Sequence, residues 1–419
     1  MASSRPLLAP DSQRTPRNWG GGGTGTLGLV ATTAYLDYAA STPVRPEAVE
    51  AMRPFLADVF GNPSGMHDAA RRAKTALEEA REQVADALGA QPREVVFTGG
   101  GTEADNLAVK GTAWAAREQH AGDTIVVTAF EHHGVLGPAE RLEREGFHVR
   151  HVKVLPSGVV DLDHLAASVD ESTAVVSVML VNNEVGTIQP LDEVVRVVRE
   201  RAPRAVVHTD AVQAVPWLDV AAATAGVDLV AISAHKFGGP KGVGALVVRD
   251  GVRLVPVIDG GGQEMGRRSG THNMSGIVGM AAALGVTTAA RPAEVERVSA
   301  LRDRLAAGLA EAVPDAYFNG DDAHKVAGNV HVGFPGVEAE ALLLMLDREG
   351  VCAAAGSSCQ SGSMDPSHVL TAMGVDRERA LSSVRLSLGW PSTAADVDRA
   401  LEVIPAAVDR LRPLAAKAR

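Results

Sequence analysis

The stretch Leu229-Val230-Ala231-Ile232-Ser233-Ala234-His235-Lys236-Phe237-Gly238-Gly239 runs from four apolar residues into a lysine and a glycine-rich turn. The apolar run predicts a strand buried on both faces, and the glycines predict a tight turn directly after it. A lysine is rarely buried unless it is paired or functional. Lys236, at the carboxyl end of such a strand, would face the crevice where open α/β sheets bind ligands, and there it suits Schiff-base chemistry. The alternative is a solvated loop lysine.

Earlier parts of the chain repeat this strand pattern. Short β-branched runs occur at Val95–Phe97, Ile125–Val127, Val175–Val178 and Ala205–Val207. Near-continuous apolar strands are typical of a parallel sheet covered on both faces. Between the strands lie helical patterns, the clearest at 69–88, where apolar residues recur on one face. Strand–helix alternation predicts an α/β fold with an open sheet.

The chain divides into three parts by pattern. Residues 1–33 are rich in proline, glycine and arginine and predict a flexible extension, with an organelle transit peptide as the weaker alternative. Residues 46–290 carry the strand–helix alternation and form the predicted large domain. Beyond 290 helical patterns dominate, at 299–312, 338–349 and 394–412 with a strand-like run at 329–333. Residues 34–45 and 291–419 therefore form the predicted smaller α+β domain.

Composition excludes several classes of protein. The 419 residues carry 40 basic and 51 acidic side chains, a net charge of -11, which disfavours direct nucleic-acid binding. No apolar run approaches the roughly 18 residues that span a bilayer, so no membrane association is expected. The two cysteines, Cys352 and Cys359, form neither a disulfide framework nor a metal-site pattern, and they favour a reducing compartment.

Four other motifs follow predicted strands. After 95–97 comes Gly99-Gly100-Gly101-Thr102-Glu103, an anion site if a helix begins near Thr102, although glycine-rich turns are common. Glu131-His132-His133 follows 125–127; one imidazole could stack on an aromatic cofactor, and adjacent histidines make a poor metal site. Asn182-Asn183-Glu184 could bind polar cofactor atoms or only shape a turn. His208-Thr209-Asp210 offers a carboxylate for a protonated ring nitrogen or a helix cap.

All five segments would gather at one edge of a parallel sheet, because each follows a strand. Together they offer a lysine for a Schiff base, an acid for a ring nitrogen, a stacking imidazole and an anion cradle. This set of groups fits pyridoxal 5′-phosphate (PLP).

From about Tyr35 to Pro391 the chain resembles the cysteine desulfurases of the NifS/IscS type, a branch of the fold-type I, class-V aminotransferase-like PLP enzymes. The length of the loop around Cys359 resembles group I of that branch. The resemblance implies a large domain with a mostly parallel, seven-stranded sheet covered by helices, and a smaller α+β domain. The matching motifs are Tyr35-Leu36-Asp37-Tyr38-Ala39-Ala40, Gly61-Asn62-Pro63-Ser64, Gly101-Thr102-Glu103-Ala104-Asp105-Asn106, Glu131-His132, Asn182-Asn183-Glu184-Val185-Gly186, His208-Thr209-Asp210-Ala211-Val212-Gln213, Ser233-Ala234-His235-Lys236, Arg268-Ser269-Gly270-Thr271, Gly356-Ser357-Ser358-Cys359 and Val384-Arg385-Leu386-Ser387-Leu388-Gly389.

The resemblance implies a role for each matching residue around the cofactor ring. Lys236 would bind PLP covalently and move the α-proton of the substrate. Asp210 would pair with the ring nitrogen, Gln213 would hydrogen-bond the ring hydroxyl, and His132 would stack on the ring and assist proton transfer. Asn183 would contact both cofactor and substrate.

The phosphate and the substrate have their own implied ligands. Arg385 would clamp the substrate carboxylate with two hydrogen bonds. The residues implied for the phosphate are Gly101, Thr102, Ser233, His235 and, from the other subunit of a homodimer, Thr271.

Cys359 aligns with the nucleophile that takes sulfur from L-cysteine, which leaves L-alanine and an enzyme persulfide. Its glycine- and serine-rich surroundings, about 355–364, predict a mobile loop that visits the cofactor and then an acceptor. Cys352 lies in an apolar run and is expected to be a buried, inert thiol.

Other PLP reactions stay open, such as a selenocysteine lyase, an epimerase or an aminotransferase, as does a non-catalytic scaffold. The resemblance does not name the sulfur acceptor, which could be an iron–sulfur scaffold, a tRNA-thiolation enzyme or another sulfur carrier. The expected location is the bacterial cytoplasm.

Overall fold

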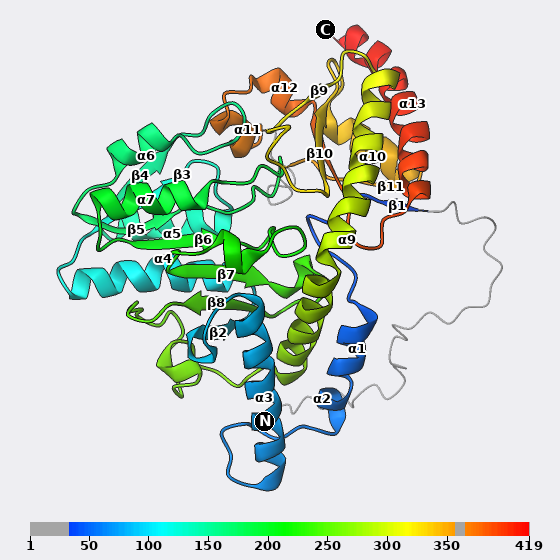
Figure 1. Ribbon diagram of the computed structural model, residues 1–419. Helices are drawn as coiled ribbons and strands as arrows, with labels where there is room; N and C mark the ends of the chain where they lie inside the picture. Colours follow the sequence, from blue (N-terminus) through cyan, green and yellow to red (C-terminus); the bar gives the residue numbers. More distant parts are fainter. Residues whose placement is uncertain (1–32, 357–364, 419) are drawn as a thin grey trace, which may run out of the picture. The chain divides into compact units, whose positions relative to one another are not determined.

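The computed structural model describes residues 33–356 and 365–418, and Thr33–Arg419 form one compact unit (Figure 1). The predicted extension 1–33, apart from Thr33, and most of the predicted loop 355–364, including Cys359, lie outside the described residues.

A seven-stranded sheet forms the larger layer of the fold. Its strand order is β2-β8-β7-β6-β5-β3-β4, and β8 is the one strand that runs antiparallel to its neighbours. This confirms the α/β fold with a mostly parallel, seven-stranded sheet. The strands are β2 (Val95–Thr98), β3 (Thr124–Thr128), β4 (His148–Val152), β5 (Thr173–Ser177), β6 (Val206–Asp210), β7 (Leu229–Ser233) and β8 (Gly244–Val248).

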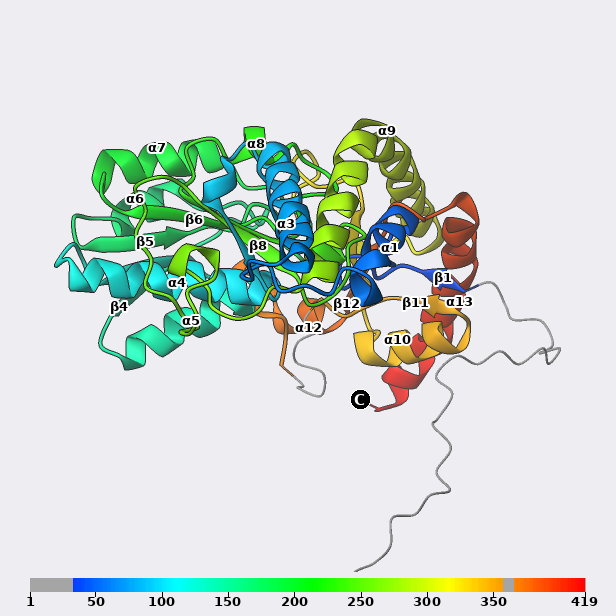
Figure 2. The same cartoon turned by 90° about the horizontal axis from the view of Figure 1, so that it is seen from below.

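Helices cover both faces of this sheet, with α7 and α8 on one side and α4 and α5 on the other (Figure 2). Successive side chains of a strand point to opposite faces. In β3, Val126 accordingly packs into one apolar core while Ile125 and Val127 pack into another. Burial on both sides is the reason why these strands read as unbroken apolar runs. The helices of this part are α1 (Pro46–Met52), α2 (Pro54–Ala57), α3 (Asp68–Ala87), α4 (Gly101–Glu118), α5 (His133–Arg144), α6 (Leu162–Ser168), α7 (Leu191–Arg201) and α8 (Val220–Ala223).

A second apolar core surrounds two small sheets. One sheet is antiparallel, in the order β12-β10-β9, and the other is the parallel pair β1–β11. Helices α10 and α13 and the second half of α9 pack against it. The elements are β1 (Ala34–Tyr35), β9 (Tyr317–Phe318), β10 (Asn329–Gly333), β11 (Val351–Cys352), β12 (Ser383–Ser387), α10 (Ala339–Arg348) and α13 (Ala394–Ala418). The short helices α11 (His368–Ala372) and α12 (Arg377–Leu381) pack into a separate apolar cluster with Phe130 and Met179.

Helix α9 (Met274–Ala312) joins the two cores. Ile277 and Leu284 belong to the core of the large sheet, whereas Val298 and Leu305 belong to the second core. Residues of α9 before position 290 pack into the core of the large sheet, and residues after it pack into the second core. The helix itself runs through position 290 without a break. The domain division at 290 therefore stays a prediction.

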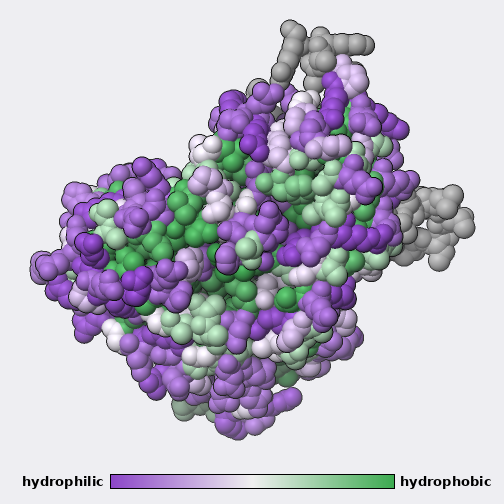
Figure 3. Space-filling model, turned by 45° about the horizontal axis from the view of Figure 1, so that its top comes forward, coloured by the Kyte–Doolittle hydropathy of each residue, from purple (hydrophilic) through white to green (hydrophobic). Residues whose placement is uncertain are grey.

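Among the described helices, only α9 is long and apolar enough to cross a membrane, by length and composition alone, and 50% of that window is buried inside the protein. The sequence has no unbroken apolar run of this length, because small and polar residues interrupt the apolar ones in α9. On the face drawn in Figure 3, hydrophilic residues dominate the rim and apolar residues gather toward the middle.

Candidate active site

A cavity of about 370 Å³ opens where the strands of the large sheet end. Its walls come from the predicted strand-end motifs and from β12 of the second sheet. The predicted site residues that line it are Gly101, Thr102, His132, Asn183, Asp210, Gln213, Ser233, His235, Lys236 and Arg385. Their individual roles stay predictions, but the gathering at one sheet edge is as expected from a parallel sheet.

The amino end of α4 forms one wall. The helix begins at Gly101, and its first backbone N–H groups have no partner within the helix, which makes this end suited to an anion. A Cβ on Gly101 would lie 2.7 Å from Val212 Cγ2 and 3.3 Å from Ser233 Cβ. Only glycine therefore allows the backbone to lie this close to β7 and the turn after β6.

Asp210 lies at the end of β6, buried, with Oδ1 accepting a hydrogen bond of 2.8 Å from the N–H of Val212. Burial raises the pKa of its carboxyl, while His132, the Val212 N–H and Lys236 act in the opposite direction. These three neighbours favour the ionised carboxylate, and a positively charged ring nitrogen placed beside it would favour that form too.

His132 caps the amino end of α5, and its Nδ1 accepts a hydrogen bond of 2.9 Å from the N–H of Gly134. The proton of the neutral ring must then be on Nε2. Burial lowers the pKa of this imidazole, so the neutral form is favoured. Ligand atoms of His132, Asp105 and Asp210 lie within 4.8 Å of one another, a spacing that could also hold a metal ion, whereas the sequence reading expected no metal site.

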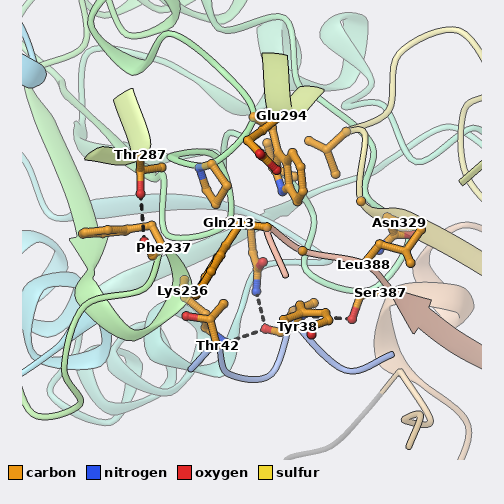
Figure 4. A pocket seen from close by; sticks show the side chains of 18 of the residues that line it. Tyr38, Thr42, Gln213, Lys236, Phe237, Thr287, Glu294, Asn329, Ser387 and Leu388 are labelled. Atoms are coloured by element: carbon orange, nitrogen blue, oxygen red, sulfur yellow. Dashed lines mark hydrogen bonds between the residues drawn. The ribbon is translucent and has the colours of Figure 1, made fainter. Parts of the chain in front are cut away.

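Lys236 follows β7 in a short 3₁₀ turn, η2 (Ala234–Lys236). Its Nζ donates to the carbonyls of Ala39 and Ala40 at 2.6 and 2.9 Å. Gln213 Nε2 also donates to the Ala39 carbonyl, at 2.8 Å (Figure 4). The solvated-loop reading of Lys236 is therefore wrong: the amine lies between two cavities and is held by the chain segment before α1.

The second cavity, of about 40 Å³, lies beside the first and shares Ala39, Asn183, Gln213 and Lys236 with it. Figure 4 shows Tyr38, Phe237 and Leu388 around this smaller space. It is large enough for little more than a water molecule. The larger cavity is therefore the candidate binding site.

Arg385 reaches the larger cavity from β12 and is one of the largest fully buried side chains among the described residues. Its Nη1 donates to the carbonyl of Asn183 and its Nη2 to Asp37 Oδ1, both at 2.8 Å. A buried guanidinium with remaining N–H donors is suited to bind a carboxylate.

His235 also lines the larger cavity. Burial first, and then Lys236 and Lys241, lower the pKa of its ring to about 4. A neutral His235 can donate or accept a hydrogen bond in this cavity but adds no charge to it.

Two predicted site residues are not part of the described cavity wall. Thr271 is exposed and does not line the cavity. The segment before it is tied to the first turn of α4 by the ion pair between Arg268 Nε and Glu103 Oε1, at 2.7 Å. Cys359 lies outside the described residues, but Gly356, which precedes its segment, lines the cavity. Cys352 is half-buried in β11, less enclosed than expected.

Sequence reasoning gave no role to several residues that line the cavity, namely Asp105, His133, Glu184 and His368. Asp105 could have been found, because it lies four residues after Gly101 and therefore on the same face of α4. His368 could not, because its contact with the ring of His133, at 4.7 Å between centroids, joins segments that are distant in sequence.

The comparisons with known proteins agree with this geometry. The aminotransferase class-V family matches residues 34–400. Cysteine desulfurase IscS of Dictyoglomus turgidum is 44% identical, over 91% of this chain and 95% of its own length. The corresponding protein of Methanosarcina thermophila is 44% identical, over 90% and 92%. The chain belongs to the NifS/IscS-type cysteine desulfurases of this family.

Solved structures show the same fold. A NifS-like protein has a TM-score of 0.85 and 36% identity, with 91% of this chain and 100% of that chain covered. DndA from Streptomyces lividans has a TM-score of 0.71 and 36% identity, over 84% and 99%.

PLP is the cofactor of this family, and the cavity fits it. The close approach of Gly101 leaves a backbone cradle for a phosphate. Asp105, which also lines the cavity, has its Oδ1 turned toward the buried His208, 3.6 Å from Nε2. Lys236 and Asp210 supply the amine and the acid that PLP chemistry requires.

Proposed function

We propose that this protein removes sulfur from L-cysteine with PLP, releases L-alanine, and holds the sulfur as a persulfide on Cys359 for transfer to an acceptor protein. One observation carries the proposal: the cavity that joins Lys236, Asp210 and Arg385 is also lined by Gly356, three residues before Cys359. A relative with 35% identity and a TM-score of 0.73, SspA, has been solved in complex with cysteine, which supports the substrate.

We assign a separate role to each side chain of the cavity. Bound PLP would supply an electron sink for charge that develops at the substrate carbon. The guanidinium of Arg385 would bind the carboxylate of L-cysteine, and Asp210 would keep its negative charge beside the cofactor ring. The Lys236 amine, once released from the carbonyls of Ala39 and Ala40, would move the α-proton. His132, neutral and with its proton on Nε2, would exchange a proton beside the reacting atoms.

The sulfur transfer itself would be a nucleophilic substitution at sulfur. The thiolate of Cys359 attacks the substrate sulfur, and a sulfur–sulfur bond forms. The carbon–sulfur bond of the substrate breaks, its electron pair stays with carbon, and carbon takes a proton to give alanine. A free cysteine has a pKa of about 8.5, so the thiol of Cys359 would have to lose its proton before the attack.

The decisive experiment measures alanine and sulfide formation from L-cysteine with a reductant, for the wild type, Cys359→Ser and Cys352→Ser. Cys352 is the matched control, because it is the other cysteine of the chain and lies in β11. We expect Cys359→Ser to keep the PLP absorbance and form no sulfide, and Cys352→Ser to stay active. Full activity of Cys359→Ser would refute the proposed nucleophile and favour a lyase or transaminase.

The same proposal extends to assembly and pathway. A homodimer would let Thr271, exposed in this chain, reach the phosphate of the second subunit. Mixing Lys236→Ala and Thr271→Ala subunits tests this, because a shared site restores activity in one of the two sites of a mixed dimer.

An acceptor in iron–sulfur cluster assembly is favoured by the relatives named IscS, with tRNA thiolation as the other candidate. A cytoplasmic location suits a reactive thiol.

A further inference from the structure

Arg385 has a second charged partner besides any substrate. Its guanidinium is held from one side by Asp37 Oδ1 and from another by the backbone carbonyl of Asn183, each at 2.8 Å. Its Nε is buried and has no partner among the described residues. Arg385 is therefore oriented before a substrate enters, and part of its donor capacity remains for a ligand.

Asp37 is itself fixed by the chain around it. We call residues 35–42 the N-terminal strap. Leu36 O accepts from the N–H of Ser387 at 2.7 Å, and the N–H of Ala39 donates to Ser387 Oγ at 2.9 Å, so the strap is bonded to β12 on both sides of Asp37. The Tyr35 hydroxyl closes the turn by donating to the carbonyls of Asp37 and Ser41, at 3.1 and 3.0 Å.

The charge around Arg385 is close to balanced in this arrangement. The side chain of Asp37 is 21% exposed and that of Arg385 only 2%, so the pair is poorly screened by solvent. Glu184 is a second, fully buried carboxyl near Arg385. Burial raises the pKa of Glu184, and the positive charge of Arg385 lowers it. One carboxylate from a ligand makes the region net negative, and a second would meet repulsion from Asp37 that the guanidinium no longer offsets.

We propose that Asp37 determines the charge specificity of the carboxylate site: with Arg385 it forms a pair that accepts a ligand with one carboxylate and rejects amino acids with a second acidic group. The inference rests on the proposed function, because it takes Arg385 as the carboxylate ligand. It deepens that function by assigning the site to monocarboxylic amino acids. In this proposal Asp37 acts by its charge beside Arg385 and not by a hydrogen bond to the substrate.

Binding of two non-thiol amino acids tests the inference without sulfur transfer. The PLP absorption band of the holoenzyme is titrated with L-alanine, which has one carboxylate, and with L-aspartate, which has two. In Asp37→Asn the amide can still accept from Arg385 but the charge is gone. We expect the ratio of the two dissociation constants, aspartate over alanine, to fall at least fivefold relative to the wild type.

Two further variants separate charge from packing. Asp37→Glu keeps the charge and should keep the wild-type ratio. Asp192→Asn removes one charge from the exposed first turn of α7 and should not alter the ratio. A ratio in Asp37→Asn within fivefold of the wild type, or an equal change in Asp37→Glu, would overturn the inference.

The two proposals fail in different ways. If the wild type gives an alanine-dependent spectral change but makes no sulfide from cysteine, the proposed function fails and the Asp37 test can still be read. If sulfide forms normally and the binding ratio does not respond to Asp37→Asn, only the Asp37 inference fails.

Discussion

Glu131 is a fully buried carboxyl whose ionised form the fold disfavours. It is fully buried at the end of the β3 segment, where Oε1 accepts from the Thr128 hydroxyl and the Met179 N–H, both at 2.8 Å. Its Oε2 has no partner among the described residues. Burial raises the pKa of this carboxyl from 4.5 to about 8, and Asp210 adds to the rise. Glu131 is therefore protonated in the folded protein at neutral pH.

The sign of the pH dependence follows from the raised pKa. The unfolded chain releases the proton near pH 4.5 and the folded chain only near pH 8, so stability is full below pH 4.5 and falls as the pH rises toward 8. One pH unit in this window is about 1.4 kcal/mol. Between pH 5 and pH 7 the wild type should lose on the order of 2–3 kcal/mol from this residue. Glu131→Gln has nearly the same shape and no titration, and should not show that loss.

The assay is urea denaturation of the holoenzyme at pH 5, 6, 7 and 8. The free energy of unfolding of Glu131→Gln relative to the wild type should increase with pH. Glu264→Gln is the matched control, because Glu264 is buried yet carries hydrogen bonds from Arg81 and His272 that outweigh burial and lower its pKa to about 2. Glu264→Gln should lose stability by the same amount at every pH from 5 to 8. A constant difference for Glu131→Gln across this range would refute the reasoning.

Three other predictions follow from single contacts. Gly101→Ala places a Cβ 2.7 Å from Val212 Cγ2, so the PLP dissociation constant should rise about tenfold or more. The constant is measured by absorbance after dialysis. Unaltered PLP affinity would contradict the proposed phosphate cradle at Gly101. Phe334→Ala empties a fully buried site in the second core and should lower the free energy of unfolding by about 3–5 kcal/mol in urea titrations; a loss under 1 kcal/mol would mean that the site collapses. Lys236→Ala should fold with a wild-type circular dichroism spectrum, lack the covalent cofactor band and make no alanine, and a retained band would exclude Lys236 as the cofactor lysine.

The sequence predicted the large sheet well, because its strands carry local signals. The runs at 95–97, 125–127 and 229–232 lie within β2, β3 and β7, and the helix predicted at 69–88 is α3, Asp68–Ala87. The β4 strand was missed. It lies at the edge of the sheet and is polar and largely exposed, so its sequence lacks the apolar run that marks a buried strand.

The antiparallel strand β8 and the first half of α9 were also missed. Strand direction is not encoded in an apolar run, because it depends on which neighbour the strand pairs with. In α9 the small residues from Met274 onward give little amphipathic pattern, since this half is buried on several sides between the sheet and other helices.

The sequence by itself determined the strand-end half of the site. Gly101, His132, Asp210 and Lys236 each follow a strand, and parallel strands place their carboxyl ends at one edge, so local patterns were enough to bring these residues together. Tertiary structure alone decided the other half. Asp37 contacts Arg385 across 348 positions of the chain, because hydrogen bonds tie the N-terminal strap to β12. Such a contact depends on the pairing of the strap with β12, and the pairing of segments so distant in the chain leaves no periodic signal in the sequence.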